Sequence, residues 1–202
     1  PMGNQIAEIN CTSTGALYKN VLTKPGATMY WELSHRGREG TDTMALVIAP
    51  YHLVKNLSGQ SELEAFIQNR LFCEETGFFH DIWSVNDPSR RHTTFEGMWP
   101  MVAGAATQEQ AKRVIDENLL NEKRFFSLHP ITTVSMEDPL FELRMWRGPV
   151  WNCMTMWAAR GCMSYGRTDA AEKLLERAID AIAAQYEKTG TVWEFYHPFI
   201  GD

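Results

Sequence analysis

The pattern of apolar and polar residues becomes helical after Pro50. A Ser-x-x-Glu capping pattern at Ser61 and Glu64 predicts a helix start, and an apolar stripe continues for about three turns. The stripe consists of Leu63, Phe66, Ile67 and Leu71. The helix is predicted to end near Gly77, because the sequence there changes to Glu-Thr-Gly.

Two more amphipathic helices follow the same rules. Thr107 and Gln110 form a capping pattern ahead of one apolar stripe, and Thr168 begins the other helix. Gly166 and Gly190 stand where glycines commonly end helices. The two stripes are Ala111, Val114, Ile115 and Leu119, and then Ala171, Leu174, Leu175, Ala178, Ile179 and Ile182.

A helix of another kind is predicted to open at Pro149 and to run to Tyr165. It carries apolar residues on nearly every side, which indicates a helix buried all round. Inner helices of this kind that alternate with one-sided outer helices are typical of two concentric rings. A four-helix bundle would show one stripe on every helix instead.

Residues 1–55 follow a different pattern and are interpreted as a β-rich segment. Apolar Met29, Trp31 and Leu33 recur with a period of two, and residues 44–48 form a short apolar run. Because two or three strands cannot bury enough surface to fold alone, this segment is expected to be an incomplete module. Residues 56–202 then form the helical domain.

Composition and charge restrict the class of protein. The 202 residues are 44% hydrophobic and 22% charged, as in a soluble globular protein. The net charge of −6 provides no basic stripe for phosphates, so nucleic-acid binding is not expected. No run approaches the roughly 20 apolar residues of a membrane span, and the N-terminus lacks the pattern of a signal peptide.

The cysteines and histidines predict neither a metal site nor a cofactor. Cys11, Cys73, Cys153 and Cys162 lie far apart without a CxxC spacing, and they are expected to be small buried residues. The histidines have no metal-ligand spacing.

Aromatic and acidic residues gather in four predicted loops. The loops cover residues 77–83, 95–100, 145–152 and 192–198. Aromatic rings beside carboxylates are suited to stacking on sugars, although the same rings can serve a large core.

Four motifs in these loops resemble one group of enzymes. Residues 146–152 read W-R-G-P-V-W-N, and residues 194–201 read E-F-Y-H-P-x-x-G; shorter matches are G-F-F-x-D at 77–81 and F-E-G-x-x-P at 95–100. The chain from about Ser61 onward resembles the C-terminal half of the trehalase, processing glucosidase I and mannosylglycerate hydrolase group, families 37 and 63. The resemblance implies part of an (α/α)6 toroid of helical hairpins, and inverting hydrolysis of α-linked gluco- or manno-type sugars.

The resemblance also implies roles for individual residues. Glu194 matches the general base, which activates water while an acid across roughly 6.5 to 9.5 Å protonates the leaving oxygen. Its aromatic neighbours predict a partly desolvated setting. Trp146 and Arg147 resemble sugar-binding residues, and we expect the Arg147 and Glu194 side chains on one open rim. Further candidate binding residues are Trp151, Asn152, Tyr196, Asp81, Glu96 and Trp99.

Each role has a structural alternative. Arg147 can form an ion pair with Glu142 or Asp138, and Glu194 can be a surface loop residue. Asp81 and Glu96 can cap helices or remain solvated. Trp151 and Asn152 can face either a cleft or the neighbouring helices.

One element of the family pattern is not found. The group's general acid, an aspartate, precedes the G-F-Y-x-D loop, where this chain has the β-rich segment. A full toroid needs roughly 300 residues or more, so about 140 residues supply only half of one. We therefore expect a fragment that exposes inner helices and self-associates or pairs with a complementary half domain. The alternatives are a non-catalytic carbohydrate-binding or cell-surface protein and a helical scaffold.

Residues 15–50 resemble a segment of β-rich modules in bacterial cell-surface proteins. The likeness rests on Pro25-Gly26, Tyr30-Trp31 and residues 35–44, which include His35 and Arg36. It favours an extracytoplasmic bacterial location.

Overall fold

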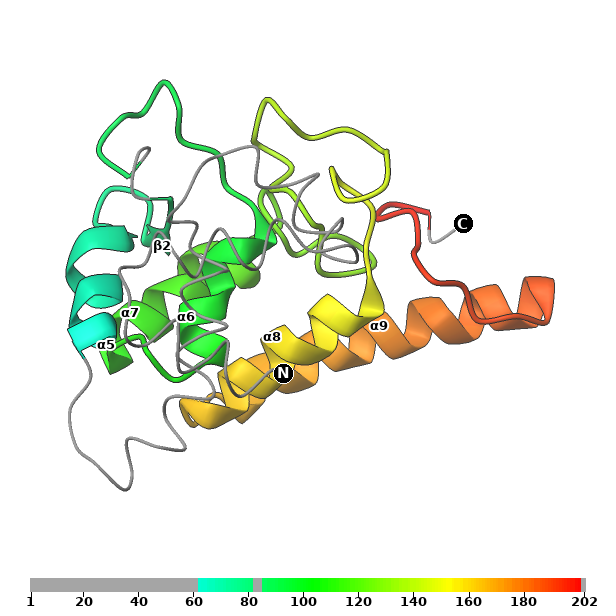
Figure 1. The fold of residues 1–202 in the computed structure, drawn as a ribbon. Helices are drawn as coiled ribbons and strands as arrows, with labels where there is room; N and C mark the ends of the chain where they lie inside the picture. The colour runs from blue at the N-terminus through cyan, green and yellow to red at the C-terminus, as the bar shows by residue number, and fades with distance from the viewer. Residues whose placement is uncertain (1–61, 82–84, 201–202) are drawn as a thin grey trace, which may run out of the picture.

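The computed structural model describes residues 62–81 and 85–200, which are mainly helical. The predicted β-rich segment, and Ser61 of the first capping pattern, lie outside the described residues. Figure 1 shows a group of short helices beside a long hairpin of two helices, with loops gathered along one side of both.

The first described helix is shorter than predicted. The α-helix α5 (Glu62–Phe66) continues as a π-helix, η1 (Ile67–Leu71). The chain then forms a small antiparallel hairpin of β1 (Phe72–Cys73) and β2 (Phe78–Phe79). Gly77 adopts a left-handed φ of 63° in the turn. The hairpin buries both Phe78 and Phe79, and this gain in apolar burial accounts for the early end of the helix.

The second capping pattern is confirmed. A 3-10 helix, η2 (Phe95–Met98), leads into α6 (Trp99–Val102), and α7 (Gln108–Arg113) continues as the π-helix η3 (Val114–Leu119). The Thr107 hydroxyl accepts from the Gln110 backbone N–H at 3.2 Å, and the Gln110 side chain accepts from the Thr107 N–H at 3.0 Å. The predicted stripe is fully buried: Ala111, Val114, Ile115 and Leu119.

The remaining helices form an antiparallel hairpin. Helix α8 (Asn152–Ser164) and helix α9 (Thr168–Thr189) lie side by side, and α9 extends well past the start of α8 (Figure 1). Gly166 and Gly190 have left-handed φ values of 74° and 71°, as predicted for the ends of these helices. Ile179 departs from the predicted stripe, since its side chain is 60% exposed.

Helix α8 differs from its prediction in two respects. It begins at Asn152 rather than Pro149, because residues before Asn152 are extended and paired with other segments. It is also not buried all round: Met156 and Met163 are 56% and 57% exposed, whereas Ala158 and Cys162 face the core. The apolar residues opposite the core thus remain uncovered.

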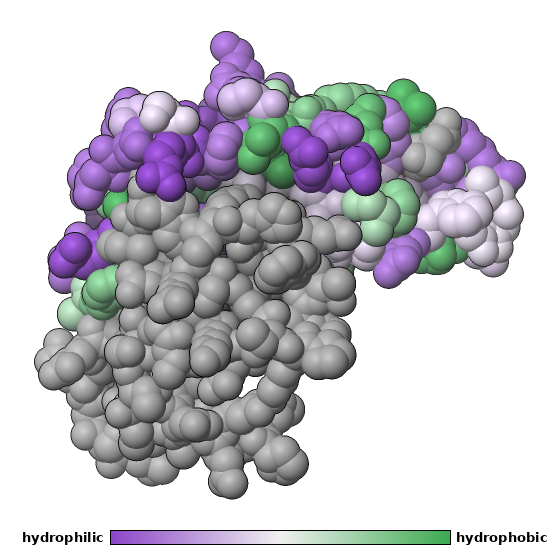
Figure 2. Space-filling model, turned by 45° about the horizontal axis from the view of Figure 1, so that its top comes forward, coloured by the Kyte–Doolittle hydropathy of each residue, from purple (hydrophilic) through white to green (hydrophobic). Residues whose placement is uncertain are grey.

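The core lies where α8 and α9 meet the shorter helices. Trp99, Met101 and Ile115 are among its buried residues. On the face shown in Figure 2, hydrophobic residues of the described part are interspersed with hydrophilic ones rather than forming one continuous apolar area. No helix in the described ranges is long and apolar enough to cross a membrane.

Candidate active site

Short backbone bridges join the motif loops at one end of the helices. Isolated antiparallel bridges connect Thr94 with Val134, Thr132 with Val150, and Val150 with Tyr196. The last bridge is closed by two hydrogen bonds of 2.9 Å between Val150 and Tyr196. The segments that carry the W-R-G-P-V-W-N and E-F-Y-H-P motifs are therefore direct neighbours, although about 45 residues separate them along the chain.

The Thr133 side chain reinforces this arrangement. Its buried hydroxyl donates to the Pro149 carbonyl at 3.0 Å and accepts from the Gly148 N–H at 2.9 Å. Gly148 has no room for a side chain, because a Cβ atom would lie 2.5 Å from the Glu142 carbonyl oxygen. Thr133 was not identified from the sequence, since a threonine in a loop carries no distinctive pattern.

Three aromatic rings are stacked where the two motifs meet. The Trp146 and Trp151 rings are nearly parallel at 3.9 Å, and the Phe195 ring stacks on Trp151 at 5.2 Å. Trp146 and Trp151 are buried, while Phe195 is 40% exposed. The indole N–H of Trp151 donates to the Met145 carbonyl at 3.2 Å. Trp151 therefore contacts the neighbouring motif segment rather than opening directly to solvent.

Glu194 lies at the exposed edge of this stack. The bridge between Val150 and Tyr196 brings Asn152, the first residue of α8, into the neighbourhood of Glu194. Cys153 follows Asn152 in the chain. Burial raises the pKa of the Cys153 thiol, and the charge of Glu194 adds to this increase. Glu194 is exposed, so the partly desolvated setting predicted for it is not observed: its neighbours Trp193 and Phe195 are themselves 50% and 40% exposed.

Arg147 is partly exposed and forms an ion pair. Its guanidinium lies 2.9 Å from the Glu142 carboxylate, and both side chains are nearly half exposed. This pair is the structural alternative considered from the sequence. An exposed ion pair contributes little to stability, so the guanidinium can exchange this partner for a ligand at small cost.

The other predicted binding residues lie in the interior. Tyr196 is fully buried, and its hydroxyl accepts from the Trp193 N–H at 2.9 Å. Trp99 belongs to the core, where its ring packs against Phe95 and Trp157. The structure does not place these two residues with the exposed residues Arg147 and Glu194. Their apolar rings gain more from the core than from the surface.

Asp81 and Glu96 are also buried, contrary to the solvated alternative. They are 7% and 4% exposed, and the Thr94 hydroxyl donates to the Glu96 carboxylate at 2.5 Å. The two loops pack closely, because a Cβ atom on Gly97 would overlap the Phe78 ring. Both carboxylates are therefore enclosed by the packed loops and are not solvated.

The structure identifies His129 as a residue that the sequence did not single out for the site. Its Nε2 lies 2.8 Å from the Asn152 side-chain oxygen, and its ring contacts the Tyr196 ring at 4.6 Å. Its backbone N–H donates to the Pro198 carbonyl at 3.0 Å. Burial lowers the pKa of His129 below its ordinary value of 6.5, and the hydrogen bond with Asn152 opposes this shift.

We expect this histidine to make folding sensitive to acid. Below about pH 6.5 the unfolded chain binds a proton at His129 that the folded chain does not bind, so the free energy of unfolding decreases as the pH falls. Urea unfolding at a series of pH values should show that His129→Gln removes this part of the pH dependence. His197→Gln is the control, because His197 is partly exposed. Equal pH dependence in wild type and His129→Gln would contradict the prediction.

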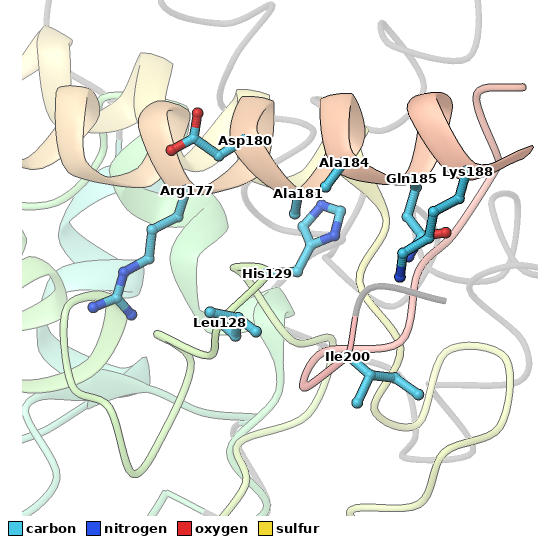
Figure 3. A pocket seen from close by; sticks show the side chains of 9 residues that line it. All are labelled: Leu128, His129, Arg177, Asp180, Ala181, Ala184, Gln185, Lys188 and Ile200. Atoms are coloured by element: carbon cyan, nitrogen blue, oxygen red, sulfur yellow. The ribbon is translucent and has the colours of Figure 1, made fainter. Parts of the chain in front are cut away.

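A pocket of about 290 Å³ lies beside His129 (Figure 3). The imidazole ring points toward α9, next to Ala181 and Ala184. The remaining lining residues are Leu128, Arg177, Asp180, Gln185, Lys188 and Ile200. Since none of the predicted site residues lines it, this pocket is distinct from the stack beside Glu194.

The described part of the chain contains three free cysteines, of which two are buried. Cys73 and Cys162 are buried free thiols, as predicted, and burial raises the pKa of Cys162 to about 12. Cys153 is exposed, contrary to the prediction, because it lies on the uncovered side of α8. Within residues 62–81 and 85–200, no cluster of three or more potential ligands could hold a metal ion.

In comparison with known proteins, the chain is similar to glycoside hydrolases. Residues 56–202 match the family described as the mannosylglycerate hydrolase MGH1-like glycoside hydrolase domain. Mannosylglycerate hydrolase MGH1 from Selaginella moellendorffii is 30% identical over 132 residues, which cover 65% of this chain and 26% of that protein. A probable trehalase from Eremothecium gossypii is 33% identical over 141 residues, or 64% of this chain and 18% of that protein. The chain thus spans about a quarter or less of these curated relatives.

Solved structures show the same fold. The GH63 mannosylglycerate hydrolase from Thermus thermophilus, in complex with glucose, aligns with a TM-score of 0.62 and 23% identity over 81% of this chain and 43% of that chain. Neutral trehalase Nth1 from Saccharomyces cerevisiae aligns with a TM-score of 0.59 and 18% identity over 80% and 34% of the two chains. The predicted fold class, part of an (α/α)6 toroid, is confirmed. The chain belongs to the mannosylglycerate hydrolase MGH1-like glycoside hydrolase family.

Proposed function

We propose that this chain carries the general-base side of an inverting glycosidase site for α-linked gluco- or manno-type sugars. The proposal rests on one observation above all: the Val150 and Tyr196 backbones pair, which brings the Trp146–Asn152 motif beside Glu194. Family membership and relatives named as mannosylglycerate hydrolase and trehalase support the reaction class.

The exposed residues of this region have distinct roles in the proposal. Glu194 acts as the general base and removes a proton from the attacking water. Arg147 donates to sugar hydroxyls or to an acidic substituent, after it exchanges Glu142 for the ligand. Phe195, the exposed ring of the stack, offers an apolar surface beside the sugar ring.

Binding is the experiment that tests the proposal. We expect saturable binding of mannosylglycerate, trehalose or glucose, followed by tryptophan fluorescence or chemical-shift changes. Arg147→Ala should weaken the affinity by roughly ten- to a hundredfold, since a charged hydrogen bond contributes about 1.5 to 3 kcal/mol. Arg144→Ala is the matched control, because Arg144 is a neighbouring exposed arginine outside the proposed contacts. Absence of saturable binding, or equal effects of the two variants, would refute the proposal.

Hydrolysis by this chain alone is expected to stay at the background rate. Inversion needs an acid as well as a base, and the motifs of this chain match the group's general base but not its acid. Release of glucose or mannose from α-glucosides and α-mannosides should therefore be the same for wild type and Glu194→Gln. Turnover that disappears in Glu194→Gln would mean that another carboxylate, with Asp81 and Glu96 as candidates, serves as the acid.

The exposed aromatic rings also favour an alternative function. Trp193 and Phe195 are 50% and 40% exposed beside Glu194, as in a surface that binds sugars without cleaving them. A non-catalytic carbohydrate-binding protein would lose its affinity for sugars in Trp193→Ala, whereas the proposed glycosidase site, which binds through Arg147 and Phe195, would keep most of it. The titration described above distinguishes the two functions when it is repeated with this variant.

The uncovered side of α8 is proposed to drive self-association. Met156 and Met163 are each more than half exposed, and apolar area of this kind is seldom left in water. Light scattering at tens of micromolar should show a mass above 23.1 kDa that falls in the double variant Met156→Lys/Met163→Lys. Ile179→Lys, on an exposed side of α9, is the control. A monomer at all concentrations would contradict this prediction.

A further inference from the structure

His129 contacts both motif segments of the candidate site from the interior. Its imidazole bonds to Asn152, its ring packs on Tyr196, and its backbone bonds to Pro198. His129 is fully buried, and the pocket that it lines is distinct from the stack beside Glu194, so we expect no direct contact between His129 and a ligand bound at that stack. Any contribution to the site must act through the residues that it holds.

The hydrogen bond with Asn152 uses the Nε2 atom of His129 and the side-chain oxygen of Asn152. A carboxamide oxygen can only accept, so Nε2 of His129 carries a proton and donates to Asn152 Oδ1 at 2.8 Å. Because burial lowers the pKa of His129, the ring is the neutral tautomer with its proton on Nε2 at neutral pH. The Asn152 NH2 group does not take part in this hydrogen bond and can donate to another acceptor. Within the described residues this NH2 group donates no hydrogen bond, and Asn152 is partly exposed to solvent.

Packing alone does not account for a histidine at this position. With Nε2 protonated, Nδ1 is a buried acceptor without a hydrogen-bond partner. Such an atom costs about 1 to 3 kcal/mol, a cost that a phenylalanine in contact with Tyr196 would avoid. The feature that phenylalanine cannot reproduce is the N–H donated to Asn152.

We propose that His129 is a positioning residue that holds the Asn152 carboxamide with its NH2 group directed to the ligand of the candidate site. This inference rests on the proposed function for the identity of that ligand. The oxygen recognised by the NH2 group belongs to a sugar hydroxyl or to an acidic substituent on the sugar. Asn152 follows Val150 by two residues, and Glu194 precedes its bridge partner Tyr196 by two, so we expect the donor and the proposed base to act on the same ligand.

The hydrogen-bond geometry can be measured without any ligand. Long-range ¹⁵N–¹H spectra of the full chain should show the His129 ring as the neutral tautomer with its proton on Nε2. In Asn152→Ala the ring should lose this preference, because the acceptor that stabilises the tautomer is gone. A proton on Nδ1 in the wild type, or an unchanged spectrum in Asn152→Ala, would overturn the inference even if the chain binds sugars.

Ligand binding provides the second measurement, with mannosylglycerate as the probe. His129→Phe should weaken binding about tenfold, whereas His129→Gln, which retains a donor, should stay within about threefold of wild type. In an Asn152→Ala background, His129→Phe should have no further effect. Additive losses would mean that His129 acts by general packing and would refute the inference. If wild type does not bind the probe, the proposed function fails, and the tautomer measurement still decides the role of His129.

Discussion

Replacing Trp151 by alanine is expected to lower the free energy of unfolding by about 3 to 5 kcal/mol, the usual range for removal of a buried tryptophan. The ring is 7% exposed and lies between Trp146 and Phe195, so its loss opens a cavity between the two motif segments. Urea unfolding followed by circular dichroism gives the change directly. Sugar binding, where present, should disappear with the stack.

Two further variants make this prediction specific. Trp193→Ala removes the same type of side chain from a position that is 50% exposed, and its effect should stay below about 1 kcal/mol. Trp151→Phe keeps a ring in contact with Phe195 and should recover part of the loss. If Trp193→Ala were as destabilising as Trp151→Ala, the stack between the motifs would not be the stabilising element.

Thr133→Val is expected to destabilise the fold by about 2 to 4 kcal/mol although the two side chains have the same shape. The substitution leaves the Pro149 carbonyl and the Gly148 N–H without the hydroxyl that serves both, and each unpaired buried group costs about 1 to 3 kcal/mol. Chemical denaturation measures the stability. Spectral shifts of Gly148 and Val150 report whether the motif loop moves.

The controls for Thr133 separate hydrogen bonding from volume. Thr133→Ser retains the hydroxyl and should be destabilised much less than Thr133→Val. Thr189→Val changes an exposed threonine at the end of α9 and should have little effect. A neutral Thr133→Val variant would show that the two backbone groups find water or other partners, and that the loop does not depend on this hydroxyl.

Sequence patterns predicted the features that depend on nearby residues. The capping box at Thr107 and Gln110 needs only residues three positions apart, and the glycines after α8 and α9 need only their own backbone freedom. The four motifs of the aromatic loops, taken together and in order, likewise indicated the family, because the residue types of each motif occur in a short segment. The family and the fold class could therefore be predicted before any coordinates were considered.

The tertiary structure alone decided which of these residues face solvent and which contact one another. Asp81 and Glu96 are carboxylates like Glu194, and Tyr196 belongs to the same motif as Glu194. Glu194 is nevertheless exposed and the other three are buried, because burial depends on segments distant in sequence. The roles of His129 and Thr133 follow from hydrogen bonds to residues 15 to 23 positions away in the sequence, which no local pattern indicates. In physical terms, local hydrogen bonds and helix periodicity are encoded within a few residues, whereas desolvation and loop pairing result from packing of the whole chain.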